Sequence, residues 1–181
     1  MEMLTSALNN NIDVECQQIL RAMTRSSNSQ KEEIDPHLLT FFGNLKNVLL
    51  AYSKYDPSIQ QPSVPFGCLA TSVLQNCQGD EVSTFWILIS LVENYEMRSF
   101  HQKGLPGVAL YGEVLHHLIE VHLPAVSYIF KQFHIEYFDY FDHWVKELFA
   151  RQMPPNLQAL FIGSFLKDSW PYFYRVCLSL I

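Results

Sequence analysis

Apolar residues in this chain recur at three- and four-residue steps within successive segments, and turn residues separate the segments. The clearest segment begins at Asp35-Pro36, where the aspartate can cap a helix and the proline fits its first turn. Before Asp56-Pro57 ends the pattern, its apolar residues are Leu38, Phe41, Phe42, Leu45, Val48, Leu49 and Tyr52. This spacing predicts an amphipathic helix with one face in a core.

The same test along the chain predicts an all-α fold, a multi-helix orthogonal bundle of about nine helices without a sheet. Besides the segment above, the expected helices are Val14–Thr24, Ser63–Cys77, Glu81–Asn94, Val108–His122, Pro124–Phe133, Ile135–Arg151, Pro155–Lys167 and Pro171 onward. Val14, Ile19 and Met23 are expected to face inward. Phe85, Trp86 and Trp144 are expected to be core aromatics, because aromatic residues at helical spacing usually are.

Composition indicates one packed domain over residues 1–181, since 49% of the residues are hydrophobic and 14% are aromatic. The formal charge of −6 argues against nucleic acid, whose binding requires clustered Lys and Arg. The longest apolar runs are shorter than the roughly 20 residues that cross a bilayer. We therefore expect a cytoplasmic protein.

Cysteine usage fits the same compartment. The four cysteines are far apart and form no Cys-x-x-Cys pair, which favours reduced and mostly buried thiols over a zinc site or a disulfide framework. They are Cys16, Cys68, Cys77 and Cys177.

Four stretches occur in a characteristic order: residues 45–59, residues 84–95 with Phe85-Trp86, Gly104-Leu-Pro-Gly107, and residues 143–149. In this order they resemble the TBC domain of Rab GTPase-activating proteins, and the resemblance covers about Gln18 to Val176. It implies an all-α fold of the TBC type. The family's opening Arg-Gly and Trp region and its last helices have no counterpart here, and the chain ends in an apolar run. We therefore expect a domain truncated at both ends.

The resemblance also implies a mechanism. In that family an arginine from Ile-x-x-Asp-x-x-Arg and a glutamine from Tyr-x-Gln-Gly reach into the GTPase site. The guanidinium neutralises charge on the phosphoryl oxygens and the amide orients the attacking water, and an arginine finger alone contributes on the order of 10³–10⁵ in rate. The first motif falls best on residues 19–25, which makes Arg25 the candidate arginine finger. A second register places Arg21 there but loses the isoleucine match.

Both motifs are altered in this chain. Ala22 stands at the aspartate position, and Ser63 stands at the position of the glutamine finger. A serine hydroxyl is too short to reach across an interface as a glutamine amide does. Gln60 and Gln61 could serve after a shift of register, so together with Arg21 they are candidate partner-binding residues. A third departure is Phe161-Ile162, at the place of the family's Trp-Asp pair.

These departures predict a GTPase-binding module in vesicle traffic whose GTPase-activating function is weak or lost, a pseudo-GAP and not an enzyme. The implied partner is a GTP-bound Rab GTPase. The protein is expected to be peripheral to membranes through its partners. No cofactor is expected. Arg25 could instead be a solvated residue at a helix end. The alternative function is a helical adaptor or scaffold that binds proteins other than GTPases.

Metal chemistry is the remaining alternative. His116 and Glu120 are four residues apart on one helix face and His122 follows, but they do not form a His-Glu-x-x-His motif. We therefore expect no metal. The absence of a Gly-x-Ser-x-Gly elbow argues against a serine hydrolase.

Overall fold

The computed structural model describes residues 12–14, 16–19, 36–59, 63–102 and 104–181. Across these ranges the regular structure is helical and contains no strand, which confirms the predicted all-α fold. The chain divides into two compact units, residues 1–94 and residues 95–181, and each is described by itself. None of the described helices combines the length and hydropathy needed to cross a membrane.

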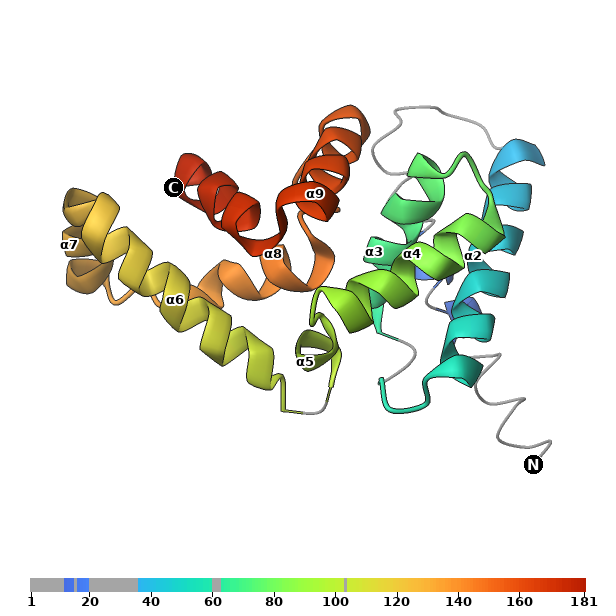
Figure 1. Cartoon of the computed structure of the whole chain (residues 1–181), viewed down its shortest axis with the longest axis horizontal. Helices are drawn as coiled ribbons and strands as arrows, with labels where there is room; N and C mark the ends of the chain where they lie inside the picture. Colours follow the sequence, from blue (N-terminus) through green and yellow to red (C-terminus); the bar gives the residue numbers. More distant parts are fainter. Residues whose placement is uncertain (1–11, 15, 20–35, 60–62, 103) are drawn as a thin grey trace. The chain divides into compact units, whose positions relative to one another are not determined.

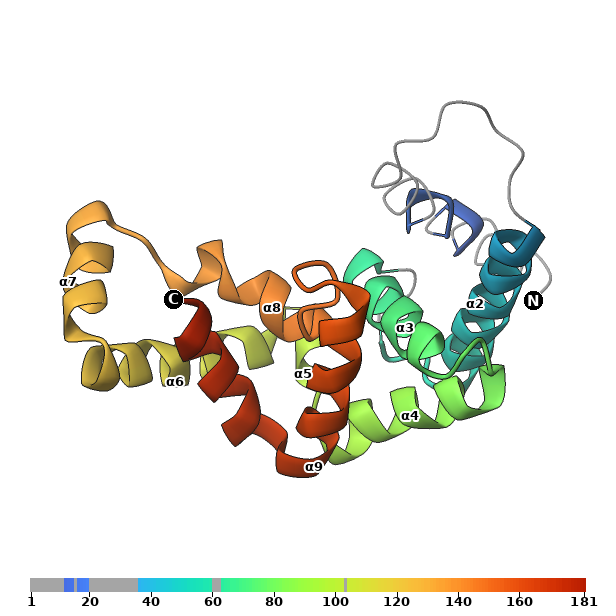
Figure 2. The same cartoon turned by 90° about the horizontal axis from the view of Figure 1, so that it is seen from above.

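Three helices of unit 1 pack against one another: α2 (Pro36–Tyr55), α3 (Val64–Asn76) and α4 (Glu81–Asn94) (Figures 1 and 2). The predicted stripe of α2 is confirmed, since Leu45, Val48, Leu49 and Tyr52 are buried. In α3 every residue from Phe66 to Leu74 is buried. A helix buried on all sides lies within a core, so α3 is a core helix.

The break that the sequence predicts between Cys77 and Glu81 is a turn. Gln78 and Gly79 both have a positive φ, of 55° and 85°, and α4 begins after Asp80. The Asp80 carboxylate accepts hydrogen bonds from the amides of Val82 and Ser83 at 3.3 and 3.2 Å, which caps the helix. Hydrogen bonds from Ser83 and Val82, the Ser83 hydroxyl first, lower the pKa of Asp80.

Residues 12–14 and 16–19 are helical, but the predicted orientation was partly wrong. Ile12, Cys16 and Ile19 are buried, whereas Val14 is 53% exposed. Residues four and three apart share a helix face, so a residue two positions from Ile12 points to the other side. Met23 lies outside the described residues.

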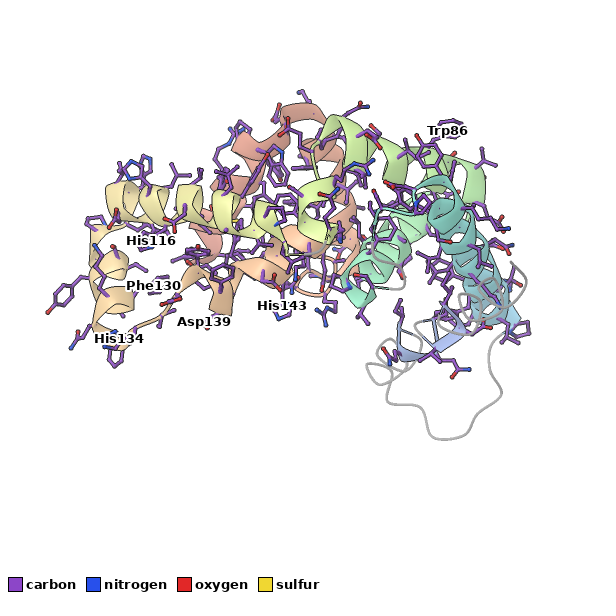
Figure 3. The ribbon with its side chains drawn as sticks, turned by 90° about the horizontal axis from the view of Figure 1, so that it is seen from below. Trp86, His116, Phe130, His134, Asp139 and His143 are labelled. Carbon is purple, nitrogen blue, oxygen red and sulfur yellow. The ribbon has the colours of Figure 1, made fainter. Side chains whose placement is uncertain are left out.

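The prediction that Trp86 is a core residue was also wrong, because its side chain is 62% exposed. The buried residues of α4 are Thr84, Leu88, Ile89, Leu91 and Val92. Trp86 follows Thr84 by two positions and therefore points away from the buried face (Figure 3). Phe85 and Trp144 are half-buried.

Unit 2 contains α5 (Arg98–His101), α6 (Pro106–His122), α7 (Pro124–Phe133), the 3-10 turn η1 (Tyr137–Asp139), α8 (Phe141–Glu147) and α9 (Pro155–Leu180). Its core is aromatic, with fully buried Phe100, Phe141, Phe149, Phe165 and Phe173. No helix was predicted over the four residues of α5. So short a helix carries no periodic signal.

The single helix predicted from Ile135 to Arg151 was wrong, since η1 and α8 divide it. The Asp139 carboxylate accepts a hydrogen bond from the Glu136 amide at 3.0 Å and closes a separate turn. Aspartate side chains compete in this way with helix hydrogen bonds. At the other end, Leu148 and Phe149 have φ values of 47° and 62°, which stops α8.

A bend in α9 falls between the two helices predicted there. Ser169 has φ 56° and ψ −146°, and Pro171 follows. Two hydrogen bonds hold the bend: Trp170 Nε1 donates to the Tyr95 carbonyl at 3.1 Å, and the Tyr95 hydroxyl donates to the Leu166 carbonyl at 2.5 Å.

Candidate functional site

The residues assigned to GTP hydrolysis by resemblance all belong to unit 1. Four of them, Arg21, Arg25, Gln60 and Gln61, lie outside the described residues, as does Ala22. Their assignments therefore stay predictions. Ser63 is described, and so are the segments on both sides of residues 60–62.

A turn fixes the chain where it leaves α2. The Asp56 amide donates to the Tyr52 carbonyl at 2.8 Å, and the Asp56 carboxylate accepts from the amide and hydroxyl of Ser58 at 3.0 and 2.6 Å. Asp56 is 7% exposed and Ile59 is 2% exposed, so both ends of this turn are buried. The segment before Gln60 is thus held by specific hydrogen bonds and by apolar burial.

Ser63 is the N-cap residue of α3 and lies immediately before the helix, which begins at Val64. Its φ and ψ are −139° and 116°, and its carbonyl accepts from the Gly67 amide at 2.9 Å. Its half-buried side chain makes no capping hydrogen bond to the helix. Nearby, Phe66 is fully buried against Tyr52 with ring centroids 4.8 Å apart. The core therefore sets the backbone at Ser63, but only a short hydroxyl extends from it.

The helical segment that precedes the predicted arginine motif borders a hollow of about 310 Å³. Its lining residues are Asp13, Cys16, Gln17, Phe42, Gly43 and Lys46. Lys46 Nζ and Asp13 Oδ1, 2.5 Å apart, form an ion pair that ties this segment to α2. Ile19, the first residue of the predicted motif, is buried. The start of the motif is thus anchored in unit 1.

Glu120, considered above as a metal ligand with His116 and His122, forms an ion pair with a lysine in the structure. Lys131 Nζ lies 2.7 Å from Glu120 Oε1, and this hydrogen bond is the main cause that lowers the pKa of Glu120. His116 Nε2 is 3.6 Å from the same oxygen. Within the described ranges, no group of three or more His, Cys, Asp or Glu side chains is arranged to hold a metal ion. The expected absence of a metal stays a prediction.

Sequence reasoning missed the turn from Asp56 to Ile59. Its signal was present, because an aspartate before Pro57-Ser58 is typical of a turn closed by the aspartate side chain. Asp-Pro had been used only to end α2. At the place of the family's Trp-Asp pair, Phe161 and Ile162 are 2% and 5% exposed, so core packing occupies that position.

The sequence matches a protein family and several known proteins. Residues 1–181 match the RabGAP-TBC family, described as the Rab-GTPase-TBC domain. The chain is 30% identical over 111 residues to GTPase-activating protein GYP5 of Saccharomyces cerevisiae, and 27% identical over 136 residues to human TBC1 domain family member 2B. It is 23% identical over 137 residues to Rab GTPase-activating protein eat-17 of Caenorhabditis elegans.

These matches cover 61%, 75% and 76% of this chain but 12%, 14% and 15% of the three relatives. The chain therefore corresponds to a small part of each relative's length. Two of the relatives are named GTPase-activating proteins. The prediction that this chain is not an enzyme is wrong on this finding, because the proteins it matches carry the name of a catalytic activity.

Proposed function

The chain belongs to the Rab-GTPase-TBC domain family, and we propose that it engages a GTP-bound Rab-type GTPase and accelerates GTP hydrolysis, at a rate reduced by its altered fingers. The observation that carries the reduced rate is Ser63 at the start of α3, in the place of a glutamine. The buried turn at Asp56 and the buried Phe66 fix the described backbone before residue 60 and after residue 62, which supports a defined position for Ser63.

Two physical arguments support residual activity. An arginine finger stabilises transition-state charge by itself, and its contribution is on the order of 10³–10⁵ in rate when it is well oriented. Without a carboxylate at Ala22, Arg25 is less well oriented, and without an amide at Ser63 the attacking water is less ordered. Both losses lower the rate, while the guanidinium charge remains.

The test is single-turnover GTP hydrolysis by a panel of Rab GTPases, with and without this chain. We expect stimulation of roughly ten- to a hundredfold for at least one GTPase, which Arg25→Ala abolishes. Arg175→Ala is the matched control, because Arg175 is an exposed arginine of α9 in unit 2. Stimulation that Arg25→Ala leaves unchanged would overturn the proposed finger.

A binding experiment separates this function from the adaptor alternative. The chain is immobilised and exposed to the same Rab GTPases loaded with GTP or GDP. Preference for the GTP form is expected, because the proposed fingers act on GTP. Absence of hydrolysis together with nucleotide-independent binding would favour an adaptor.

A further inference from the structure

Tyr52 connects the turn that follows α2 with the start of α3. It is fully buried, and its carbonyl accepts a hydrogen bond from the Asp56 amide at 2.8 Å. Its ring packs on the ring of Phe66, with centroids 4.8 Å apart. Asp56 is the first residue after α2, and Phe66 is the third residue of α3. The described segments on either side of residues 60–62 therefore share one anchor in the core.

The Asp56 carboxylate closes this turn with a single oxygen. Its Oδ1 accepts from the Ser58 amide at 3.0 Å and from the Ser58 hydroxyl at 2.6 Å. Because Asp56 is 7% exposed, both bonds are largely shielded from competition by water. The turn leads into Ile59, whose side chain is buried. Asp56 thus fixes the backbone from which the chain continues toward residue 63.

Ser63 takes its orientation from the chain before it as well as from α3. Its φ of −139° and ψ of 116° are extended, and its side chain makes no capping hydrogen bond to the helix. Helical φ and ψ values are imposed only from the first helical residue onward, which is Val64 here. The direction of the side chain at position 63 therefore depends on how the preceding segment arrives.

We propose that Asp56 is a positioning residue for the finger at position 63, and that its turn directs the side chain there toward the attacking water of the bound GTPase. This inference rests on the proposed function. The hydroxyl of Ser63 is too short to use that direction, so Asp56 should matter little to the rate of the native chain. A glutamine at position 63 should need Asp56, because a displacement of about 1 Å can cost on the order of a hundredfold in rate.

A double-mutant cycle of single-turnover GTP hydrolysis tests the positioning role. Asp56→Ala should lower the stimulated rate by less than about twofold in the native chain, but by about tenfold when Ser63→Gln is present. A purely structural role would lower both rates by the same factor. Asp56→Asn should retain the rate of Ser63→Gln, because its side-chain carbonyl supplies the one oxygen that accepts from Ser58. Equal factors in the two backgrounds, or an Asn variant as slow as the Ala variant, would overturn the proposal.

Asp139→Ala is the matched control for the cycle. The Asp139 carboxylate closes another turn, in unit 2, where it accepts from the Glu136 amide. Its removal should change the rate by the same factor with and without Ser63→Gln. If Asp139→Ala coupled to Ser63→Gln as strongly as Asp56→Ala does, the coupling would reflect a general loss of structure and the positioning role would be refuted.

Amide hydrogen exchange, followed by NMR, tests the turn without any GTPase. The Gly67 amide donates to the Ser63 carbonyl at 2.9 Å and therefore reports the start of α3. Relative to the amides of α4, its exchange should be at least about fivefold faster in Asp56→Ala, and unchanged in Asp56→Asn and in Asp139→Ala. Faster exchange without any gain in rate from Ser63→Gln would contradict the proposed function and still support positioning of residue 63 by Asp56. Unchanged exchange in Asp56→Ala would overturn the positioning role, whatever the rates are.

Discussion

In unit 2, η1 packs closely against α6 at Gly112, which has no side chain. The ring of Tyr137 lies over this residue of α6, and a Cβ at Gly112 would be 2.3 Å from Tyr137 Cδ2. The Tyr137 hydroxyl also donates to Glu113 on the same helix at 3.2 Å. The close approach of η1 to α6 therefore requires glycine, although glycine is a poor helix former.

Gly112→Ala should lower the free energy of unfolding by about 1–3 kcal/mol, because displacing the Tyr137 ring costs more than the helix propensity that alanine adds. Urea denaturation measures the change. Gly163→Ala is the control, since a Cβ there meets nothing within 4 Å, and it should stabilise by up to about 1 kcal/mol. Equal stabilisation by both variants would refute the close packing.

Ser169 carries a backbone conformation that only glycine adopts freely, with φ 56° and ψ −146°. Ser169→Gly should raise the free energy of unfolding by about 1 kcal/mol, as the relief of strain exceeds the added entropy of the unfolded chain. Thermal denaturation measures it. Ser179→Gly, in the last turns of α9, should instead destabilise by about 0.5 kcal/mol. A loss in both variants would show that the bend at Ser169 is unstrained.

The end of α8 depends on one ion pair. Glu147 is fully buried, and Arg151 Nε donates to its Oε2 at 2.6 Å while Arg151 Nη2 bonds Oε1. Beyond Glu147 the chain turns through Leu148 and Phe149, both fully buried with positive φ. The pair therefore neutralises a buried carboxylate at the point where the chain leaves the helix.

Arg151→Ala should lower the free energy of unfolding by about 3 kcal/mol, because it leaves the Glu147 carboxylate buried without its guanidinium. Adding Glu147→Gln should recover part of the loss, since the uncompensated charge is removed. Denaturant titrations of the single and double variants give both values. If Arg151→Ala costs less than about 0.5 kcal/mol, as expected for an exposed surface pair, this account of α8 fails.

How well the helices could be predicted depended on whether their signals were local. The bounds of α4 and α7 agree with prediction, because Asp80 and Pro124 mark their starts in the sequence itself. The division at Asp139 and the outward position of Trp86 depended on competing hydrogen bonds and on which face meets a neighbour. Periodicity gives a helix but does not choose between its faces when both are apolar.

Within unit 2, one buried histidine makes stability depend on pH. His101 is 4% exposed, and burial, with the nearby charge of Lys146, lowers the pKa of His101 to about 4. The folded chain therefore keeps the imidazole neutral, whereas the unfolded chain protonates it near its ordinary pKa of about 6.5. The stability gained by the neutral form is complete above pH 6.5 and is lost as the pH falls toward 4.

Lowering the pH from 7.5 to 5.0 should reduce the free energy of unfolding by about 2 kcal/mol through His101. His101→Gln should reduce this pH-dependent loss of unfolding free energy by about that amount. His117→Gln should not, because the side chain of His117 is 75% exposed in the native chain. Chemical denaturation at each pH gives the slopes. An unchanged slope in His101→Gln would assign the acid sensitivity to other groups.

For the whole molecule, the order of the matching stretches along the sequence predicted the family better than any single motif did. The succession of stretches from Leu45 to Phe149 was sufficient to predict the TBC family, which the match over residues 1–181 confirms. The site was predicted less completely. Ser63 could be placed at a helix start, but the turn held by Asp56 arises from burial and from Ser58, which motif matching does not weigh.

The proposed function rests on altered finger residues, in a chain of the Rab-GTPase-TBC domain family, that reduce the rate of GTP hydrolysis. The most direct measurement is single-turnover hydrolysis with the responsive Rab GTPase and the double variant Ala22→Asp, Ser63→Gln, which restores both family residues. The account predicts at least a tenfold faster stimulated rate than the native chain gives, and a loss of that gain when Arg25→Ala is added. An unchanged rate in the folded double variant would contradict it.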